Sequence, residues 1–283
     1  MSQFSIMGRK QTIAGVVLTL NEEQDLPRAL NSLSWCDELI VVDSGSTDRT
    51  HEVAEQFGAH FLQHSQSAPF LITEQRNWAL ASAGIVSDWV LFLDADEEVG
   101  SELASLILAT ITSSSTITAY ELTPRYLFLG KWLRRTQGYP NWHPRLVKRG
   151  RVFFEGGVWE SFSPDSLVGR LPIPYEHYAF SKGLDDWLDR HRRYAAWDAQ
   201  QIFDYLSGDS SSISTRRWRT LRLAMSRLWF LRPPLRFTQK YFLQLGFLEG
   251  WQGLLFASMM AFYDLMTVIK VIELRRKRAG QPL

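Results

Sequence analysis

The stretch VLFLDADEEVG, from Val90 to Gly100, decides the fold that this sequence predicts. The apolar run from Trp89 to Leu93 is short and leads directly into acidic residues, as expected of a buried strand that ends at a turn. Asp94 and Asp96 follow that strand with one residue between them. Such a D-x-D pair is either an acidic turn that begins the next helix or a site for a divalent metal ion.

Apolar runs of the same kind recur through the first half of the chain and alternate with helical patterns. The runs are rich in β-branched residues, which favours strands, and capping residues precede the helices. Buried strands that alternate with helices are typical of βαβ units, so we predict an α/β fold with a mainly parallel, Rossmann-like sheet. The predicted strands are Thr12 to Leu20, Glu38 to Val42, Ala59 to Gln63 and Trp89 to Leu93, and the predicted helices are Leu26 to Leu33 after the cap Asp25, a helix from Thr47 or Asp48 to Gly58, Thr73 to Ala83, and Glu102 to Ile111 after the cap Ser101.

The second half of the chain has a different character. Residues 119–180 are dense in Gly, Pro and aromatic residues, which predicts short strands and long loops. Residues 184–206 have a helical pattern, and the polar segment 207–215 has the composition of a linker. We therefore predict an α/β domain over residues 1–206, a linker over 207–215 and a separate tail over 216–283.

Polar residues end three of the predicted strands. They are Asn21, Asp43 and Asp94. Ligands of open α/β sheets bind outside the carboxyl ends of the strands, so these side chains are expected at one crevice. Carboxylates there can hold a divalent metal, which would neutralise a nucleotide diphosphate and support its departure as a Lewis acid. Aspartate-nucleophile phosphatases also carry D-x-D after a strand, but they favour Thr or Val where Glu98 stands here.

Four motifs in series then point to a family. TLNEEQDLPRALNSL, WCDELIVVDSGSTDRT, EQRNWAL and DWVLFLDADEE occur in this order in the first half of the chain. The series resembles the inverting family 2 glycosyltransferases, which have the GT-A fold. The resemblance is greatest to the subgroup of lipopolysaccharide-core β-1,4-glucosyltransferases, which shares an R-x-x-x-x-G-K segment, a P-x-x-x-x-R-L segment and an aromatic-rich basic tail. The matching residues here are Arg125, Gly130 and Lys131, and Pro140, Arg145 and Leu146.

The resemblance implies a role for each matching position in the nucleotide-binding half. It implies binding of a nucleotide-sugar, with UDP the expected nucleotide, and a Mn²⁺ or Mg²⁺ cofactor. Leu20, Asn21 and Glu22 would line the nucleotide end of the crevice, Asp43 would bind uracil, Arg76 would lie near the base or the first aspartate, Asp94 would contact ribose or a metal-bound water, and Asp96 would ligate the metal. Glu97 and Glu98 are interpreted as acids at a helix start, where the helix dipole favours them.

Inversion also requires a general base that takes the proton of the acceptor hydroxyl. In the resembled subgroup this base lies in a V-H-E-like segment, which reads GGVWE here and makes Glu160 the candidate. Trp159 replaces the usual His and would suit stacking on a sugar ring, while Asp165 is the reserve base. A surface position for Glu160 stays open. His177 would contact the diphosphate or complete the metal site, with a core histidine an equal alternative. His143 and Arg145 would bind an anionic acceptor or the diphosphate.

The tail is basic and aromatic. From Arg216 onward the chain carries 13 Lys and Arg against 3 Asp and Glu, whereas the rest carries 18 against 27. Such a segment can meet nucleic acid, an anionic membrane surface, or the acidic domain of the same chain. The apolar region that follows favours the membrane. Its longest charge-free run, Gly250 to Tyr263, has 14 residues, short of the roughly 20 that a crossing needs. Asp264, Thr267, Lys270 and Glu273 form one polar flank, which predicts a helix that lies in the interface.

These observations combine into one expectation. A metal-dependent enzyme transfers a sugar with inversion from a nucleotide-sugar, for which the resemblance suggests UDP-glucose, to a membrane-associated glycan or lipid acceptor. The lone Cys36 and the lack of a signal-peptide pattern favour a cytoplasmic chain at the inner face of the membrane. The alternatives are a nucleotidyltransferase, which should begin with a glycine-rich phosphate loop that is missing from this sequence, and a non-catalytic nucleotide-sugar-binding protein.

Overall fold

The computed structural model describes residues 11–66, 71–113, 115–156, 160–207 and 225–283. The chain divides into two compact units, which we call the sheet unit and the helical unit. The sheet unit comprises Met1–Leu127 and Tyr139–Ser181, and the helical unit comprises Phe128–Gly138 and Lys182–Leu283. The helix predicted over 184–206 therefore belongs with the tail, and the units divide at residue 182 instead of near 206. Most of the predicted linker lies outside the described residues.

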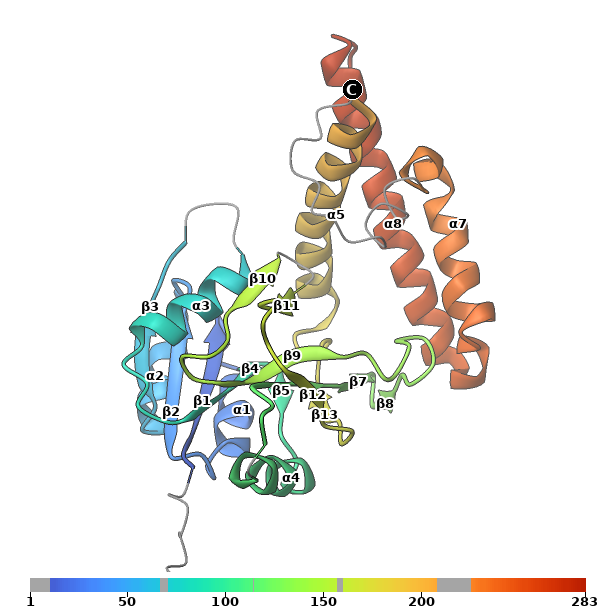
Figure 1. Ribbon diagram of the computed structural model, residues 1–283. Coiled ribbons are helices and arrows are strands. Elements are labelled where there is room, and N and C mark those ends of the chain that lie inside the picture. Colours follow the sequence, from blue (N-terminus) through green and yellow to red (C-terminus); the bar gives the residue numbers. More distant parts are fainter. Residues whose placement is uncertain (1–10, 67–70, 114, 157–159, 208–224) are drawn as a thin grey trace, which may run out of the picture. The chain divides into compact units, whose positions relative to one another are not determined.

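The sheet unit is built on a seven-stranded sheet in the order β12-β6-β9-β4-β1-β2-β3 (Figure 1). Neighbours from β4 to β3 are parallel, and β9 runs antiparallel between β4 and β6. The predicted α/β fold with a mainly parallel sheet is thus confirmed. The strands are β1 (Ile13–Thr19), β2 (Glu38–Asp43), β3 (His60–Gln63), β4 (Trp89–Asp94), β6 (Ala119–Leu122), β9 (His143–Lys148) and β12 (Val168–Arg170).

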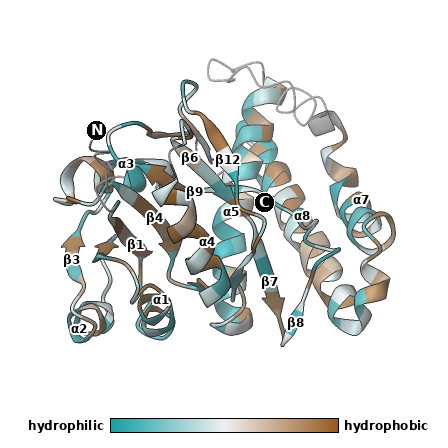
Figure 2. Cartoon of the chain, turned by 60° about the horizontal axis from the view of Figure 1, so that its bottom comes forward, coloured by the Kyte–Doolittle hydropathy of each residue, from teal (hydrophilic) through white to brown (hydrophobic). Residues whose placement is uncertain are grey.

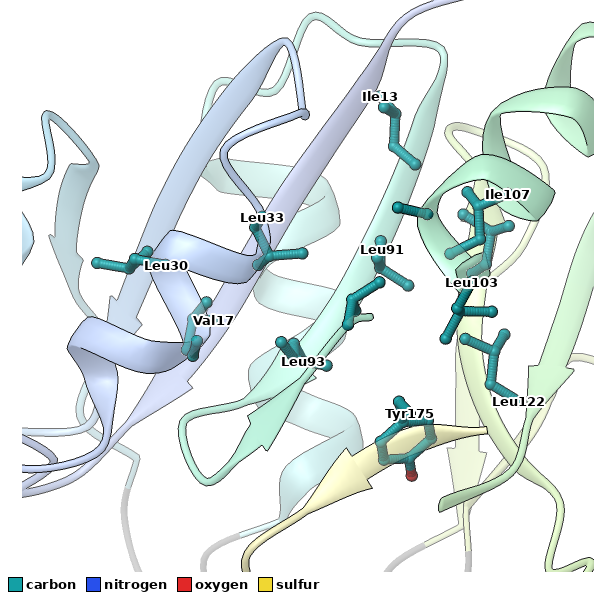
Figure 3. Packing of buried hydrophobic residues seen from close by; sticks show 14 of the residues in the cluster. Ile13, Val17, Leu30, Leu33, Leu91, Leu93, Leu103, Ile107, Leu122 and Tyr175 are labelled. Carbon is teal, nitrogen blue, oxygen red and sulfur yellow. The ribbon is translucent and has the colours of Figure 1, made fainter. Parts of the chain in front are cut away.

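Alternating side chains of the strands fill two hydrophobic layers. Val17 of β1 packs with one cluster, which includes α1 (Leu26–Ser32) and α4 (Ser101–Thr112), while its neighbour Val16 packs with the other, which includes α3 (Ile72–Ser82). Figure 3 shows Leu30 of α1, Leu33 just after that helix, and Leu103 and Ile107 of α4 gathered around the strands of the first layer. Helices on both faces explain why the strands read as continuous apolar runs. The fourth helix is α2 (Thr50–Gln56).

Two predicted capping contacts differ in the structure. Asp25 occupies the N-cap position of α1, but its carboxylate binds Arg28 and the Ser181 hydroxyl instead of the helix N–H groups. Ser101 is the first helical residue of α4, so the N-cap is Gly100. Both helices nevertheless begin within one residue of the predicted position, because their apolar faces pack against the sheet.

Short strands between residues 97 and 177 form smaller sheets outside the main sheet. They are β5 (Glu97–Glu98), β7 (Pro124–Phe128), β10 (Phe154–Gly156), β11 (Glu160–Phe162) and β13 (Tyr175–His177). β13 pairs with β5 and with β7, so that His177 lies opposite Glu97 on one side and Tyr126 on the other. β10 and β11 form a hairpin in which Gly156 faces Glu160.

The helical unit is organised by its last helix. α8 contacts both α5 and α7. The elements are β8 (Lys131–Trp132), α5 (Gly183–Ser207), η1 (Met225–Leu231), α7 (Arg232–Phe237), η2 (Thr238–Leu243), η3 (Gly246–Glu249) and α8 (Gly250–Arg278). Among the described residues, the helical run Gly246–Arg278 is the one that is long and apolar enough to cross a membrane by length and composition alone.

A buried cluster of charges joins the three helices. The carboxylate of Asp264 is 1% exposed and pairs with Arg232 at 2.9 Å and Arg236 at 2.7 Å. Asp198 of α5 accepts hydrogen bonds from Arg232 at 3.1 Å and from the Tyr263 hydroxyl at 2.8 Å. The polar flank predicted for this helix faces inward at Asp264. Two cations of the basic tail are likewise engaged within the unit.

We expect Asp264→Asn to destabilise the helical unit by about 3 kcal/mol, because it leaves the half-buried Arg236 without its counter-charge and Arg232 with Asp198 alone. Urea unfolding followed by circular dichroism measures this as a lower midpoint with an unchanged slope. Lys277→Gln, at an exposed position of the same helix, is the control and should shift the free energy of unfolding by less than about 0.5 kcal/mol. Equal effects of the two substitutions would contradict the role of the cluster.

Candidate functional site

The polar ends of three strands lie side by side in the main sheet. Thr19 at the end of β1 is in register with Asp43 at the end of β2, and Leu18 of β1 is in register with Asp94 at the end of β4. The sequence predicted that these ends share one edge, and the register agrees. This edge is where open α/β sheets bind their ligands.

Asp43 organises the loop that follows β2. One carboxylate oxygen accepts hydrogen bonds from the Thr19 hydroxyl at 2.8 Å and from the Ser46 hydroxyl. The other accepts from the N–H groups of Gly45 at 2.8 Å and Ser46 at 2.7 Å. Gly45 has a φ of 108°, which residues with a side chain rarely adopt. A nucleobase could bind this carboxylate only by sharing or replacing one of these bonds.

Asn21 links the loops after β1 and β2. Its backbone is left-handed, with a φ of 57°, a conformation that Asn tolerates well. Its side-chain oxygen accepts from the Thr47 N–H at 2.8 Å, and its own N–H donates to the Ser46 hydroxyl at 2.7 Å. Glu22 continues the link through its N–H, which donates to Thr50 at 2.9 Å, while Leu20 is 44% exposed. Hydrogen bonds therefore hold Asn21 and Glu22 of the predicted nucleotide end against the loop after β2, and Leu20 stays exposed beside them.

A network of buried charges holds Asp94 at the end of β4. Its carboxylate pairs with Arg145 of β9 at 3.0 Å and with Arg76 of α3 at 3.4 Å. Arg145 also pairs with Glu97 at 2.6 Å, and the other oxygen of Glu97 accepts from the backbone N–H of Asp94 at 2.9 Å. Arg76, Arg145 and Glu97 are almost completely buried. The position of Asp94 is therefore fixed from three sides.

Burial and pairing shift the pKa values of these groups in opposite directions. Burial alone would raise the pKa of Asp94, but the charges of Arg145 and Arg76 outweigh it and hold that pKa well below its usual range. Burial raises the pKa of Glu97 to about 7, aided by the nearby charge of Asp94. Burial and the charge of Arg145 lower the pKa of Arg76 to about 10. Asp94 is the carboxylate that stays ionised at neutral pH.

Asp96, in the turn between β4 and β5, lies beside His177 of β13. His177 Nε2 lies 3.4 Å from Asp96 Oδ2, and the His177 ring packs on Tyr126 with centroids 4.7 Å apart. Tyr178, the next residue along, donates its N–H to the Asp96 carbonyl at 2.8 Å. Burial disfavours the charged imidazole, but the neighbouring Asp96 carboxylate overcomes this and raises the pKa of His177.

These two residues fit a metal that a substrate helps to hold. Within the described residues, no group of three or more His, Cys, Asp or Glu side chains is arranged to hold a metal ion. Mg²⁺ is commonly bound through one or two carboxylates together with substrate phosphates, and carboxylates also suit Mn²⁺. Asp96 with His177 offers such a partial site, which diphosphate oxygens would complete.

Glu160 is tied to the same network through Arg76. The Arg76 guanidinium pairs with Glu160 at the start of β11, and it also donates to the Pro144 carbonyl at 3.3 Å. A single buried guanidinium therefore contacts both Asp94 and Glu160. The Glu160 side chain is 15% exposed, so it is not the solvated surface residue that the sequence left open. Trp159 lies outside the described residues.

His143 and Arg145 differ from their predicted use as binders of an anionic acceptor. Burial, together with the charge of Arg145, lowers the pKa of His143 to about 3, so the imidazole is neutral at physiological pH and bonds to Asn141 at 2.9 Å. Arg145 is 3% exposed and directs its charge toward Asp94 and Glu97. Its observed contacts are those of an internal counter-ion.

Glu97 belongs to this charge network, and the sequence interpretation missed it. It was interpreted as an acid at a helix start, but it lies in β5 and is completely buried. Ala95, Glu97 and Val99 face inward, and the residues between them are less buried. The sequence carried no signal for this at Glu97, because Glu97 is as polar as its neighbours Asp96 and Glu98.

The comparisons with known proteins agree with this geometry. Residues 16–164 match the family model described as glycosyl transferase family 2. This chain belongs to that family. The predicted family and the GT-A fold are thereby confirmed.

Individual relatives extend the similarity along most of the chain. An uncharacterized glycosyltransferase of Rickettsia typhi is 25% identical over 280 residues, covering 94% of this chain and 88% of that protein. The lipopolysaccharide core biosynthesis glycosyltransferase LpsC of Rhizobium meliloti is 23% identical over 270 residues, covering 93% of each. Among solved structures, glucosyl-3-phosphoglycerate synthase of Mycobacterium tuberculosis with Mn²⁺, UDP and glucosyl-3-phosphoglycerate is 24% identical, with a TM-score of 0.39 over 49% of this chain and 57% of that chain.

We expect Arg145→Met to destabilise the sheet unit by about 3 kcal/mol at neutral pH, since it removes the counter-charge of the buried Glu97 and leaves Asp94 with Arg76 alone. The pKa of Asp94 is lower in the folded than in the unfolded chain, so its pairing stabilises the fold above about pH 4 and contributes less as pH falls further. The deficit of the variant should therefore shrink below about pH 4. Urea unfolding at several pH values measures it, with the exposed Arg151→Met as control. A small deficit that does not change with pH would contradict this role.

Proposed function

We propose that this glycosyltransferase transfers a sugar from a UDP-sugar, with inversion and with help from a divalent metal, to a membrane-associated glycan or lipid. The observation that carries the proposal is the link through Arg76, which contacts Asp94 on the donor side and Glu160 on the acceptor side. Two carboxylates held by one buried cation have a fixed separation, as single displacement requires.

The donor would bind along the ends of β2, β1 and β4. Leu20, Asn21 and Glu22 would line its nucleotide end, with Asp43 toward the base and Asp94 toward the ribose. Asp96 and His177 would hold Mn²⁺ or Mg²⁺ against the diphosphate, where a metal supplies Lewis-acid stabilisation of the departing group. The His177 ring packs on Tyr126 and contacts the Asp96 carboxylate, and these two contacts restrict its orientation.

Glu160 would act as the general base. It removes the proton from the acceptor hydroxyl while that oxygen forms a bond to the anomeric carbon, and the bond from that carbon to the diphosphate oxygen breaks on the opposite face. The Arg76 guanidinium pairs with the Glu160 carboxylate, so we expect the acceptor to loosen this contact as it binds.

The acceptor class rests on the relatives and on the tail. LpsC of Rhizobium meliloti is named for lipopolysaccharide core biosynthesis, and this supports a glycan of the cell envelope as the acceptor. UDP-glucose is the donor that the sequence resemblance favours. Such acceptors are attached to membranes, so we place the enzyme in the cytoplasm at the inner face of the cell membrane.

One assay distinguishes sugar transfer from two other functions. A nucleotidyltransferase would release pyrophosphate from a nucleoside triphosphate, and a non-catalytic binding protein would bind a UDP-sugar without turnover. Release of UDP from a panel of UDP-sugars, with membrane extract as acceptor, would support transfer against both.

We expect Glu160→Gln to reduce transfer at least about 100-fold, because the typical contribution of a general base is of that order or larger. UDP affinity should be unchanged, since the substitution leaves the donor side in place. UDP release measures transfer, and isothermal titration measures binding. Asp165→Asn is the control and should keep full activity. Full activity of Glu160→Gln would assign the base to another residue.

Asp96→Asn should weaken the stimulation of transfer by Mn²⁺, because the carboxylate charge is the larger part of the predicted metal site. The measurement is a Mn²⁺ titration of UDP release after treatment with a chelator, and the half-saturating Mn²⁺ concentration should rise about 10-fold or more. Glu102→Gln, on the exposed first turn of α4, serves as the control. Undiminished metal dependence in the variant would refute Asp96 as a ligand.

A further inference from the structure

The helical unit exposes apolar side chains over a long continuous stretch. From residue 242 to residue 272, every side chain in the exposed class is uncharged, and nearly all are large and apolar. Figure 2 shows far more of the hydrophilic colour on α5 than on α8. The exposed apolar residues, which we call the apolar face, are Phe242, Leu243, Leu245, Phe247, Leu248, Trp251, Leu254, Leu255, Phe262, Leu265, Ile269 and Ile272.

The charged residues of the same stretch are buried or half-buried. Glu249 is 5% exposed and Asp264 is 1% exposed, while Lys270 is half-buried. A helix on the surface of a water-soluble protein has the reverse arrangement, with charges outside and apolar residues inside. Burial of a charge has a free-energy cost that only pairing offsets. This inverted polarity indicates an apolar environment outside the apolar face.

The turn at one end of the apolar face is braced from within. The Glu249 carboxylate accepts from the N–H groups of Arg135 at 2.6 Å and Thr136 at 3.0 Å, and its carbonyl accepts from Lys131 at 2.7 Å. The buried Lys240 donates to the Thr136 carbonyl. Leu245 is held in a left-handed conformation with a φ of 58°. These contacts fix the backbone, so Leu243 and its neighbours stay on the outside.

We infer that the apolar face is seated in the surface of a lipid bilayer, with α8 lying along the membrane plane. A spanning orientation does not fit, because α8 packs along α5, which exposes Arg192, Arg193 and Gln200. Exposed cations border the face at Arg134 and Arg135 and along Arg275–Arg278, where they suit lipid phosphates. This inference rests on the proposed function, since it explains how the enzyme reaches a membrane-attached acceptor.

The driving force differs from the one that the sequence indicated. Three cations of the basic tail are occupied inside the unit, since Arg232 and Arg236 pair with Asp264, and Lys240 bonds to Thr136. Attachment therefore depends mainly on apolar insertion, and the basic border adds to it. Binding should persist on uncharged lipid and at high salt, where electrostatic attraction is screened.

The test is flotation of the full chain with vesicles of phosphatidylcholine alone and of phosphatidylcholine mixed with phosphatidylglycerol, at low and high salt. The full chain should float with both. Leu243→Glu combined with Leu248→Glu should lower the partition coefficient on both lipids by at least about 10-fold, because burial of even one leucine side chain corresponds to that factor. Leu108→Glu, at an exposed leucine of α4, is the matched control and should bind like the unmodified chain.

Depth is measured through Trp251, which is 58% exposed. Brominated phosphatidylcholine should quench tryptophan fluorescence of the unmodified chain more than that of Trp251→Phe. Undiminished flotation of the double variant, or quenching that does not depend on Trp251, would overturn the inference. So would a lipid-free dimer that the double variant abolishes, because the face would then belong to a second copy.

Neither the flotation nor the quenching measurement uses a donor or an acceptor. Their results therefore hold even if no transfer is detected. Conversely, hydrolysis of a UDP-sugar by the double variant in detergent should equal that of the unmodified chain. A binding defect with normal hydrolysis separates the membrane inference from the proposed function. Circular dichroism of the variants confirms that the helices are retained.

Discussion

The arrangement of the site depends on the ion pairs of buried Arg145 with Asp94 and Glu97. Two acidic groups lie within reach of one another at the end of β4, and without a counter-charge their repulsion and burial would favour protonation. Arg145 enters from β9, the antiparallel strand beside β4. The insertion of that strand therefore does more than extend the sheet. It supplies the cation that keeps Asp94 ionised and fixes the turn that presents Asp96.

Much of this arrangement could be predicted from the sequence, and the reason is local. Buried parallel strands are continuous apolar runs, so β1, β2 and β4 were recognisable, and their polar ends identified Asp43 and Asp94. The resemblance placed Arg76 near the base or the first aspartate, and Arg76 does pair with Asp94. The contacts of Arg76 with Pro144 and Glu160, and those of Arg145, were not predictable in this way. Arg76 lies 68 positions from Pro144 and 84 from Glu160 in the sequence. Arg145 lies 51 positions from Asp94 and 48 from Glu97. Such pairings depend on tertiary packing that periodicity does not encode.

In the helical unit, the sequence predicted the helix but not which of its sides faces the solvent. The sequence correctly indicated a helix with one polar flank, because spacing along a helix is a local property. It did not indicate which flank faces the solvent, since that depends on the partners. Asp198 on α5 and the arginines on α7 turn the flank at Asp264 inward, and the apolar side chains consequently face out. Polarity alone could not distinguish a water-facing flank from a buried network.

The central claim is a single displacement at the anomeric carbon, with Glu160 and the diphosphate on opposite sides of the sugar. The anomeric configuration of the product tests this most directly. Transfer from a UDP-sugar with an α linkage, followed by proton NMR of the isolated product, should give a β-linked sugar. An α-linked product would contradict the account, because retention requires a different mechanism and a different use of Glu160.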